Sequence, residues 1–343
     1  MEKGVSVVIC CYNSSKLLPE TLRHICIQSV PPEIKWEVII VDNSSTDNTS
    51  ETAREFLLKY NCPVSYKIIH ESIPGLSFAR KAGIENAQFE YLVFCDDDNR
   101  LNSDYIETAF NIMEKNNNIG ICGGKSDAMS DTEFPDWFNK FSQSYSVGKQ
   151  AVKTGYILEK SDIIWGAGMV VRNTVVRELY SKGFKSLLTD RKQGELTSGG
   201  DSELCYAMKI FGVKIYYDEN LKLKHYLPDF RLNWKYLKRL HRAFGAQKIY
   251  FEPYLQILNL KNNSGEITGN NWQAESYRLI KKLRSYGFKK LLKLKDIPEG
   301  NEDALRIEKT FGRLKELLSI RKRYDFNFRQ IKNADWVKKK FSE

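Results

Sequence analysis

The segment Cys95–Asn99, with the sequence CDDDN, places three consecutive carboxylates directly after an apolar run. Adjacent carboxylates repel one another unless a cation neutralises them. Alternate residues at the end of a strand point to the same side, so Asp96 and Asp98 share a face. Carboxylate oxygens are the ligands that Mg²⁺ and Mn²⁺ prefer. The segment fits either a site for one of these ions or an acidic helix start, because Asn102 or Ser103 can begin the next helix.

These residues need a scaffold, and the first 125 residues have the pattern of a parallel sheet with crossover helices. Short apolar runs alternate with segments of helical length, which is typical of an open α/β sheet. Ligands bind such a sheet beyond the carboxyl ends of its strands. The predicted strands are Val5–Cys10, Trp36–Val41, Val64–Ile69, Tyr91–Cys95 and Ile119–Cys122, and the predicted helices are Lys16–Gln28, Thr46–Tyr60, Ser77–Ala87 and Asp104–Asn116.

The pattern changes twice further along the chain. Over residues 126–161 we expect irregular structure or short helices, and from residue 229 onward the chain has the composition of basic helices. We therefore predict an α/β domain over residues 1–228 and a helical, basic C-terminal region over residues 229–343. Between these parts we predict strands at Ile163–Val171, Val213–Tyr217 and Leu221–His225 and helices at Thr174–Ser181 and Asp201–Phe211.

The positive charge is concentrated in the C-terminal third. Residues 231–343 hold 27 Lys and Arg against 12 Asp and Glu, a net charge of +15, whereas the first 230 residues carry 26 against 31, a net charge of −5. Interleaved aromatic residues such as Trp234, Tyr236 and Phe244 fit nucleic-acid binding, contact with an anionic membrane surface, or helices packed on the α/β domain. Nucleic-acid binding leaves CDDDN unexplained, so we expect no nucleic-acid partner.

Other features exclude several classes of protein. The seven cysteines show no CxxC or Cys/His spacing, which argues against a zinc site and favours reduced thiols. The first predicted strand leads into CCYNSS rather than GxGxxG, which argues against a dinucleotide-dependent dehydrogenase. The start MEKGVSVVIC lacks a signal-peptide pattern, and no run approaches the roughly 20 apolar residues of a membrane span. We expect a cytoplasmic protein, either free or peripheral at the inner face of the plasma membrane.

Five segments in order carry a resemblance to a known family. They are SVVICCYNSSKLLPETL, EVIIVDNSSTDNT, PGLSFARKAGIENA, YLVFCDDDN and GGDSELCYAMKIFGVKIYYDENLKLKH. The series resembles the family 2 inverting glycosyltransferases of the GT-A fold over about residues 4–226. The resemblance implies an α/β fold with a Rossmann-like, mostly parallel central sheet. It also implies that the predicted domain 1–228 is catalytic, with a nucleotide-sugar half over about residues 1–125 and an acceptor half over about 126–228.

The resemblance implies a nucleotide site at the ends of the first two strands. Cys11, Tyr12 and Asn13 correspond to the loop beneath the nucleotide. Asp42 corresponds to a carboxylate that accepts a hydrogen bond from the base. The segment DNSSTDNT also fits an Asx turn or helix cap at Asp42, and the two roles can coexist.

The phosphates of the donor are expected near the next crossover helix. Arg80 matches a basic residue of the family that can lie near them, although a solvated surface charge explains it equally well. Asp96 is expected to contact the ribose or the metal shell. The remaining residues of the predicted donor site are Asn43, Gly75 and Asp97.

The metal and the catalytic base are implied by later motifs. Asp98 corresponds to the direct ligand of Mg²⁺ or Mn²⁺, and His225 to a histidine that can complete the coordination. Asp201 in GGDSEL matches the family's catalytic base, and the alternative is that it only caps the helix opening at Ser202. The family frequently has Glu before this Asp, where this chain has Gly200.

The segment WGAGMVVR resembles the family segment that lines the sugar and the acceptor. Its small residues Gly166, Ala167 and Gly168 allow close approach of a ligand to the backbone, and Trp165 can either stack on a sugar or pack in the core.

The resemblance as a whole implies transfer of a sugar, with inversion, from a UDP-, GDP- or dTDP-sugar to a hydroxyl of a saccharide or lipid-linked acceptor. We expect a role in cell-surface polysaccharide or glycolipid biosynthesis. Addition of a single sugar is favoured, because the QxxRW-type motif of the processive synthases is absent.

Overall fold

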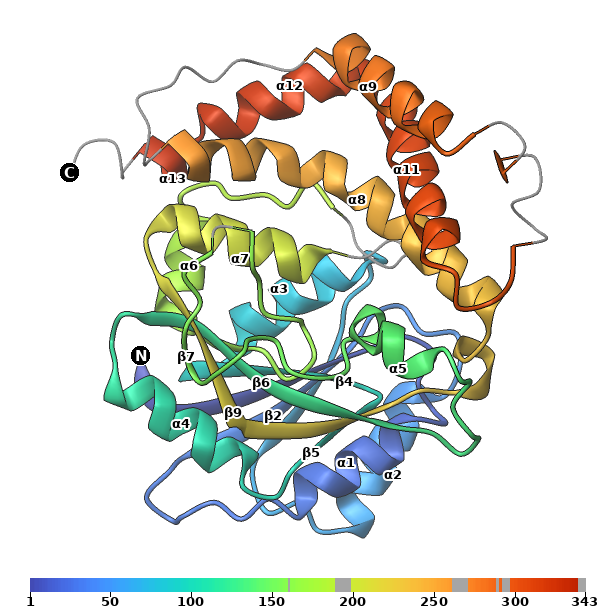
Figure 1. Cartoon of the computed structure of the whole chain (residues 1–343). Coiled ribbons are helices and arrows are strands. Elements are labelled where there is room, and N and C mark those ends of the chain that lie inside the picture. The colour runs from blue at the N-terminus through green and yellow to red at the C-terminus, as the bar shows by residue number, and fades with distance from the viewer. Residues whose placement is uncertain (160, 189–198, 261–270, 288–289, 292–296, 339–343) are drawn as a thin grey trace.

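The computed structural model describes residues 1–159, 161–188, 199–260, 271–287, 290–291 and 297–338. A twisted sheet forms the centre of the described chain, and helices cover both of its faces (Figure 1). The helices of the C-terminal third form a further layer over one face.

Four parallel strands form the first half of the sheet. They are β1 (Glu2–Cys11), β2 (Trp36–Asp42), β3 (Tyr66–His70) and β4 (Phe89–Asp96). The helices of this half are α1 (Leu18–Cys26), α2 (Thr49–Lys59), α3 (Leu76–Asn86) and α4 (Tyr105–Lys115). In the strand register Cys11 lies opposite Asp42, and Cys10 lies opposite Asp96. The carboxyl ends of these strands therefore meet at one edge of the sheet.

Both faces of this sheet are buried, which explains the continuous apolar runs of its strands. Val7 and Ile9 of β1 pack with α1, α2 and α4, whereas Val8 between them packs with α3 on the opposite face. All three side chains are fully buried. Full burial of an aliphatic side chain contributes about 1.5–3 kcal/mol, so these runs favour a central strand strongly.

Five further strands complete a mixed sheet. They are β5 (Asn99–Leu101), β6 (Ile119–Met129), β7 (Gly155–Tyr156), β8 (Val170–Arg172) and β9 (Lys214–Tyr226). Within the described residues the strand order is β3-β2-β1-β4-β8-β6-β9-β5, and β7 pairs with β9. The helical elements of this part are α5 (Phe138–Phe141), the 3₁₀ turn η1 (Ser142–Tyr145), α6 (Asn173–Ser181) and α7 (Gly200–Phe211). The predicted mostly parallel α/β fold is confirmed.

Two predicted strand boundaries were wrong for a local reason each. The predicted strands Val213–Tyr217 and Leu221–His225 are one strand, β9, because the register against β6 shifts between Gly123 and Lys125 and the extra residues form a bulge. The predicted strand Ile163–Val171 is reduced to β8, because the chain turns at Gly166–Met169. Gly168 there has φ of 71°, and the N–H of Met169 donates to the Gly166 carbonyl at 3.2 Å.

Two further differences concern strands that the sequence pattern did not predict. Residues 126–129 continue β6 instead of beginning the irregular stretch, because they pair with β9. Residues 99–101 form the short strand β5, which pairs Asn99 with His225 of β9. This pairing brings CDDDN beside the end of β9.

The described part of the chain beyond residue 228 forms helices, two of which cross closely. They are η2 (Asp229–Arg231), α8 (Trp234–Leu260), α9 (Trp272–Ser285), α11 (Glu302–Ser319), α12 (Arg321–Lys332) and α13 (Asp335–Lys338). A Cβ atom on Gly245 of α8 would lie 1.9 Å from the Lys309 carbonyl oxygen of α11, and one on Gly312 would lie 1.9 Å from the Arg242 carbonyl oxygen. Only glycine permits this approach of the two backbones.

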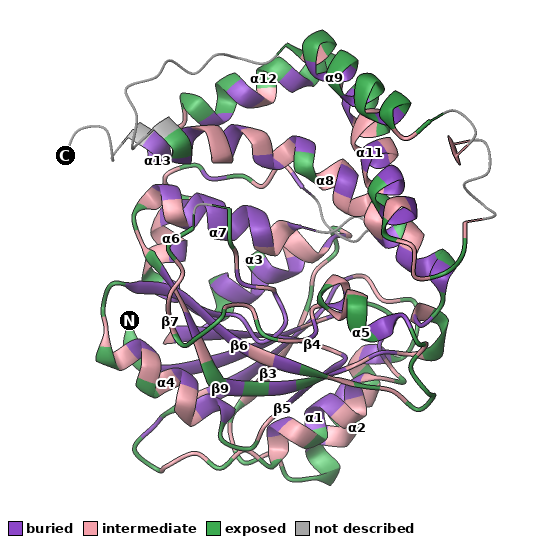
Figure 2. Cartoon of the chain, in the orientation of Figure 1, coloured by how far each residue is buried: buried purple, intermediate pink, exposed green. Residues whose placement is uncertain are grey.

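The C-terminal helices share hydrophobic core with the sheet. Phe251, Tyr254 and Trp336 belong to the same buried cluster as Leu204 of α7. In Figure 2 much of α7 is buried, and α8 carries separate buried segments. Aromatic residues of this region are thus partly used for internal packing. Among the described residues, no helix combines the length and the apolar character that a bilayer span requires.

Candidate active site

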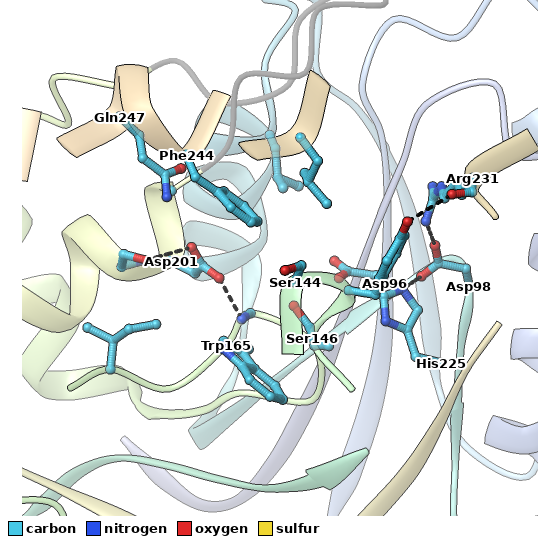
Figure 3. A pocket seen from close by; sticks show the side chains of 18 of the residues that line it. Asp96, Asp98, Ser144, Ser146, Trp165, Asp201, His225, Arg231, Phe244 and Gln247 are labelled. Carbon is cyan, nitrogen blue, oxygen red and sulfur yellow. Dashed lines mark hydrogen bonds and ion pairs between the residues drawn. The ribbon is translucent and has the colours of Figure 1, made fainter. Parts of the chain in front are cut away.

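A cavity of about 1240 Å³ lies where the strands β1 and β4 end, between the α/β sheet and the helix α8. All of the predicted site residues line it except Asp42, Gly75 and Gly168. Figure 3 shows Asp201 and Trp165 on one side of the cavity and Asp98, His225 and Arg231 on the other. The predicted residues that line it are Cys11, Tyr12, Asn13, Asn43, Arg80, Asp96, Asp97, Asp98, Trp165, Gly166, Ala167, Asp201 and His225.

The loop after β1 is fixed to the loop after β2. Asn13 has a positive φ of 53°, its N–H donates to Ser45 Oγ at 3.0 Å, and its side-chain oxygen accepts the N–H of Thr46 at 2.7 Å. Tyr12 lines the cavity, and 40% of the residue is exposed. The thiol of Cys11 is buried, and burial raises its pKa well above the ordinary value, so this thiol is neutral.

Asp42 lies outside the cavity lining, and both of its oxygens have local partners. Oδ1 accepts the N–H of Ser45 at 3.0 Å, and Oδ2 accepts the hydroxyl of Ser50 at 2.5 Å. These contacts are those of an Asx turn or helix cap at Asp42. Such a role can coexist with recognition of the nucleotide base. The contact of Asp42 with a base stays a prediction.

Asn43 lines the cavity and is hydrogen-bonded to Gly75, which lies outside the lining. The side-chain oxygen of Asn43 accepts the N–H of Gly75 at 2.7 Å, and its amide nitrogen donates to the Ile73 carbonyl at 2.7 Å. Gly75 has φ of 140° and precedes α3. The two residues therefore hold the start of the helix that carries Arg80.

Arg80 is 7% exposed, which rules out the solvated surface charge. Its guanidinium lies over the ring of Phe94 at 5.8 Å. A Cβ atom on Gly166 would lie 2.5 Å from Arg80 Nη2. The glycine thus leaves room for a buried cation on the side of the cavity that carries Asp201.

Asp98 is the most enclosed carboxylate of CDDDN, with 3% of the residue exposed. Its Oδ1 lies 3.4 Å from His225 Nε2, and its Oδ2 accepts a hydrogen bond from Arg231 Nη1 at 2.8 Å. The neighbouring Asp97 accepts a hydrogen bond from the Ser14 hydroxyl, and burial with the charge of Asp98 raises the pKa of Asp97 to about 7.

His225 and Asp98 fit a divalent cation as two of its ligands. Nδ1 of His225 is buried and has no hydrogen-bond partner among the described residues. Within the described residues no cluster of three or more His, Cys, Asp or Glu side chains is arranged to hold a metal. A cation at Asp98 would therefore need oxygen ligands from substrate or water, as Mg²⁺ and Mn²⁺ commonly have.

Arg231 was missed in the sequence analysis. It lies in η2, the short turn that follows β9, and no motif marks it. Burial opposes its charge, but the carboxylate of Asp98 and the nearby Tyr236 and Asp97 raise its pKa above the ordinary value. A fixed positive charge therefore stands beside the carboxylate that is expected to hold the metal.

Asp201 lies in the first turn of α7 and is held in two ways. Its Oδ2 accepts the N–H of Gly166 at 2.8 Å, and its Oδ1 accepts the N–H of Ser202 at 2.7 Å. The second contact is the cap-like one, but the first ties the carboxylate to the WGAG segment and holds it at the cavity. Glu203, two residues on, is fully buried away from the cavity lining.

The sugar-side segment divides into lining and packing residues. Trp165 lines the cavity, and its backbone N–H donates to Gln150 Oε1 at 2.6 Å. Gly168 instead meets the core, because a Cβ atom there would lie 2.4 Å from the Tyr105 hydroxyl. Its glycine is explained by this contact and by its positive φ.

Helix α8 contributes a wall of the cavity that the sequence analysis did not predict. Phe244 and Gln247 lie over Asp201 in Figure 3. A Cβ atom on Gly199 would lie 2.8 Å from both Gln247 Oε1 and Phe251 Cζ, so α8 packs directly on the start of α7. The available signal was the interleaving of basic and aromatic residues, which fits nucleic-acid binding and membrane contact as well as packing on the α/β domain.

Comparisons with known proteins identify the family. The family model "Glycosyl transferase family 2" matches residues 6–180, about half of the chain. A cholesterol galactosyltransferase of Borreliella burgdorferi is 30% identical over 118 residues, which are 34% of this chain and 31% of that protein. Glycosyltransferase GlyG of Streptococcus pneumoniae is 30% identical over 155 residues, 45% and 49% of the two chains. The chain thus matches half or less of the length of these relatives.

One solved structure supports the fold over nearly the whole chain. The mannosyltransferase PcManGT of Pyrobaculum calidifontis, solved with GDP-Man and Mn²⁺, superposes with a TM-score of 0.58 at 16% identity. The match covers 94% of this chain and 87% of that one. The resemblance in the sequence is confirmed by the family model and the fold, and the chain belongs to glycosyl transferase family 2.

Proposed function

We propose that the protein is a metal-dependent inverting glycosyltransferase that moves a sugar from a nucleotide-diphosphate donor to an acceptor hydroxyl. The observation that carries this proposal is one cavity with two chemically distinct sides. One side holds the buried Asp98 with His225, and the other holds the carboxylate of Asp201. Membership of family 2 and the chemistry of the relatives support the same reaction.

The donor would lie across the ends of β1 and β4. Tyr12 and Asn13 would contact the nucleotide, Asp42 would accept a hydrogen bond from the base, and Asp96 would contact the ribose. A structurally similar mannosyltransferase is described with GDP-Man and Mn²⁺, and we extend the use of a nucleotide sugar and Mn²⁺ or Mg²⁺ to this chain. The proposed donors are UDP-, GDP- and dTDP-sugars.

Asp98 and His225 would hold the cation. When bound, the cation offsets the negative charge that develops on the departing nucleoside diphosphate. Arg231 and Arg80 are fixed cations of this chain that line the same cavity. Both can stabilise the diphosphate oxygens as the bond to the sugar breaks.

Asp201 would act as the general base. The acceptor hydroxyl oxygen forms a bond to the anomeric carbon as the bond from that carbon to the phosphate oxygen breaks, and the hydroxyl proton passes to the Asp201 carboxylate. The N–H groups of Gly166 and Ser202 hold this carboxylate in place. Attack from the face opposite the leaving group inverts the configuration.

Different parts of the chain would bind the donor and the acceptor. We assign donor binding mainly to residues 1–125, acceptor binding to 126–228 and to the cavity wall from α8, and a role in cell-surface polysaccharide or glycolipid synthesis. Trp165, Gly166 and Ala167 would line the sugar. The basic C-terminal region would contact an anionic membrane surface. We propose no binding of nucleic acid.

A screen of nucleotide sugars tests the proposal. The protein is incubated with UDP-, GDP- and dTDP-sugars and Mn²⁺ or Mg²⁺, and slow donor hydrolysis and thermal stabilisation are measured, with Asp98→Asn as the matched control. We expect hydrolysis of one class of donor by the wild type alone. The absence of both hydrolysis and stabilisation with every donor would overturn the proposal. Retention of the donor configuration in the product would overturn the single-displacement mechanism.

A further inference from the structure

The cavity wall formed by η2, α8 and α11 carries a charge pattern that the transfer chemistry does not use. Six cations line this wall against one acid, Glu252; they are Arg231, Lys235, Arg239, Lys248, Lys309 and Arg313. Two of them are paired, Arg231 with Asp98 and Arg313 with Glu252 and Glu275. For the other four the described residues provide no ion pair.

Like charges from two helices come together in this wall. Lys309 stands at the close crossing of α11 with α8, where its carbonyl oxygen meets Gly245. Burial, and then the charges of Lys248, Lys282 and Arg313, lower the pKa of Lys309 to about 8. Lys309 is half-buried, whereas Lys235, Arg239 and Lys248 are exposed. The charge of Lys309, with other cations nearby, destabilises the fold unless an anion offsets it.

Glu252, the acid in this wall, does not offset the charges of the unpaired cations. The carboxylate of Glu252 accepts hydrogen bonds from Arg313 and from the hydroxyl of Tyr324. The arrangement therefore suits a negative charge that is brought in by a ligand.

The position of this wall relates it to the acceptor. Gln247, directly before Lys248, packs on Gly199 at the start of the helix that carries Asp201. Asp98 and His225, which would hold the donor diphosphate through a cation, lie on the opposite side of the cavity (Figure 3). The end of the wall near Lys248 therefore lies on the side of Asp201, whereas its other end, at Arg231, lies beside Asp98.

The length of the row indicates what kind of anion it takes. Lys235 and Lys248 are thirteen residues apart on α8, which corresponds to about 20 Å along the helix. A single phosphate or carboxylate is shorter than this row. An acceptor with several phosphate groups can use the whole of it, and ammonium groups bind phosphate oxygens as point charges.

We propose that Lys235, Arg239, Lys248 and Lys309 form an acceptor subsite for phosphate groups, so that the acceptor is a phosphodiester-linked chain or a comparable phosphate-rich molecule. This inference rests on the proposed glycosyl transfer, because the acceptor side is defined by Asp201. It adds the chemical class of the acceptor to that proposal.

Binding of a phosphodiester probe to the full chain tests this subsite. The donor site is first filled with Mn²⁺ and the nucleoside diphosphate that the donor screen identifies. A short glycerol phosphate oligomer is then titrated by calorimetry against the wild type and against Lys248→Gln/Lys309→Gln. Lys238→Gln/Lys315→Gln is the matched control, because it removes the same charges from the same two helices at positions outside the cavity lining.

We expect the cavity variant to bind the oligomer about tenfold more weakly or worse, while the control variant stays within about twofold of the wild type. Nucleoside diphosphate affinity should change little in both. Equal losses in the two double variants would overturn the subsite. Binding of the oligomer only when the donor site is empty would also overturn it and would assign the cations to the donor diphosphate.

Two further measurements keep the test decisive. If the cavity variant fails to fold, the wild type is titrated with an uncharged polyether of the same length, and equal affinity for the two probes overturns the proposal. Vesicles of anionic lipid are tested in parallel, and binding of vesicles without binding of the oligomer would assign the cations to a membrane surface. Failure of the proposed function has a different signature, because then no nucleotide sugar is hydrolysed and no nucleoside diphosphate binds.

Discussion

Nη1 of Arg231 lies 2.8 Å from Oδ2 of Asp98, and only 12% and 4% of the two side chains are exposed. Residue 231 thus supplies a cation to a carboxylate that lies 133 positions earlier in the chain. The pair keeps the buried charge of Asp98 balanced before any divalent cation binds. A bound cation would share this carboxylate with the arginine.

Replacement of Arg231 tests this balance. Loss of one partner of a buried ion pair typically costs about 3–5 kcal/mol, so Arg231→Gln should lower the free energy of unfolding by about 3 kcal/mol without metal. Because Mn²⁺ can then neutralise Asp98 alone, its addition should stabilise the variant more than the wild type. Urea denaturation with and without Mn²⁺ measures both effects. Lys238→Gln on α8 is the control, and an equal response to Mn²⁺ in all three proteins would contradict the prediction.

Removal of the metal or of its ligands should abolish turnover. Excess EDTA is expected to stop nucleotide-sugar hydrolysis, and Mn²⁺ or Mg²⁺ should restore it. Asp98→Asn should lose turnover and donor affinity together, whereas His225→Asn should raise the Mn²⁺ concentration needed for half-maximal rate. Initial rates over a metal titration give these values. Full activity in EDTA would exclude the metal-dependent mechanism.

Asp201→Asn keeps the shape of the side chain and removes its basicity. We expect kcat to fall by about 10²–10⁴-fold, the usual contribution of a general base, with little change in nucleoside diphosphate affinity. Glu203→Gln on the same helix is the contrast, because Glu203 accepts hydrogen bonds from Tyr254 and from the N–H groups of Leu187 and Leu188. That variant should lose stability while it keeps kcat. Near-normal kcat in Asp201→Asn would reduce Asp201 to a helix cap.

The glycine contact between α8 and α11 should be sensitive to one methyl group. Gly245→Ala would place its Cβ 1.9 Å from the backbone oxygen of Lys309, so the helices must separate. We expect the free energy of unfolding to fall by about 1–3 kcal/mol, which is typical of overpacking. Ala246→Gly is the neighbouring control and should cost about 1 kcal/mol through helix propensity. Chemical denaturation measures the stability of both variants. If Gly245→Ala is as stable as the wild type, the close crossing of α8 and α11 is contradicted.

The half-buried His241 should make the stability of the protein depend on pH. Burial, and then the charge of Lys309, lower the pKa of His241 to about 4, from 6.5 for an unperturbed histidine. The unfolded chain therefore binds the proton first, and the contribution of His241 to stability is lost as pH falls from about 6.5 to about 4. His241→Gln should make the free energy of unfolding less dependent on pH in this window. The same slope in both proteins would contradict the prediction.

The sequence was sufficient for the parallel half of the sheet and for the gathering of its polar strand ends. Apolar runs such as SVVIC determine strands buried on both faces, and the connections determine which ends meet. The bulge in β9 was not predictable, because Asp218, Glu219 and Asn220 have the composition of a turn. Pairing with β6 on either side of them, at Tyr217 and at Lys222, keeps the strand continuous instead.

The wall from α8 could not be placed for a different reason. Its residues Phe244, Gln247 and Lys248 lie far from the motifs in sequence, and nothing local specifies which element a basic amphipathic helix packs against. The contacts at Gly199 and Gly245 determine its position. Arg231 was hidden for the same reason, since its partner Asp98 is a long-range one.

The hydrogen bond from Tyr254 to Glu203 bears on the order in which the chain can fold during synthesis. The two residues are 51 positions apart, and α7 ends at Phe211. Chains grow at about 5–20 residues per second, so α7 is complete roughly 2–9 seconds before Tyr254 is added. During that interval the apolar side of α7 lacks its cover from Phe251 and Tyr254. The nascent α/β part therefore passes through a period in which this surface is open to chaperones and to other chains.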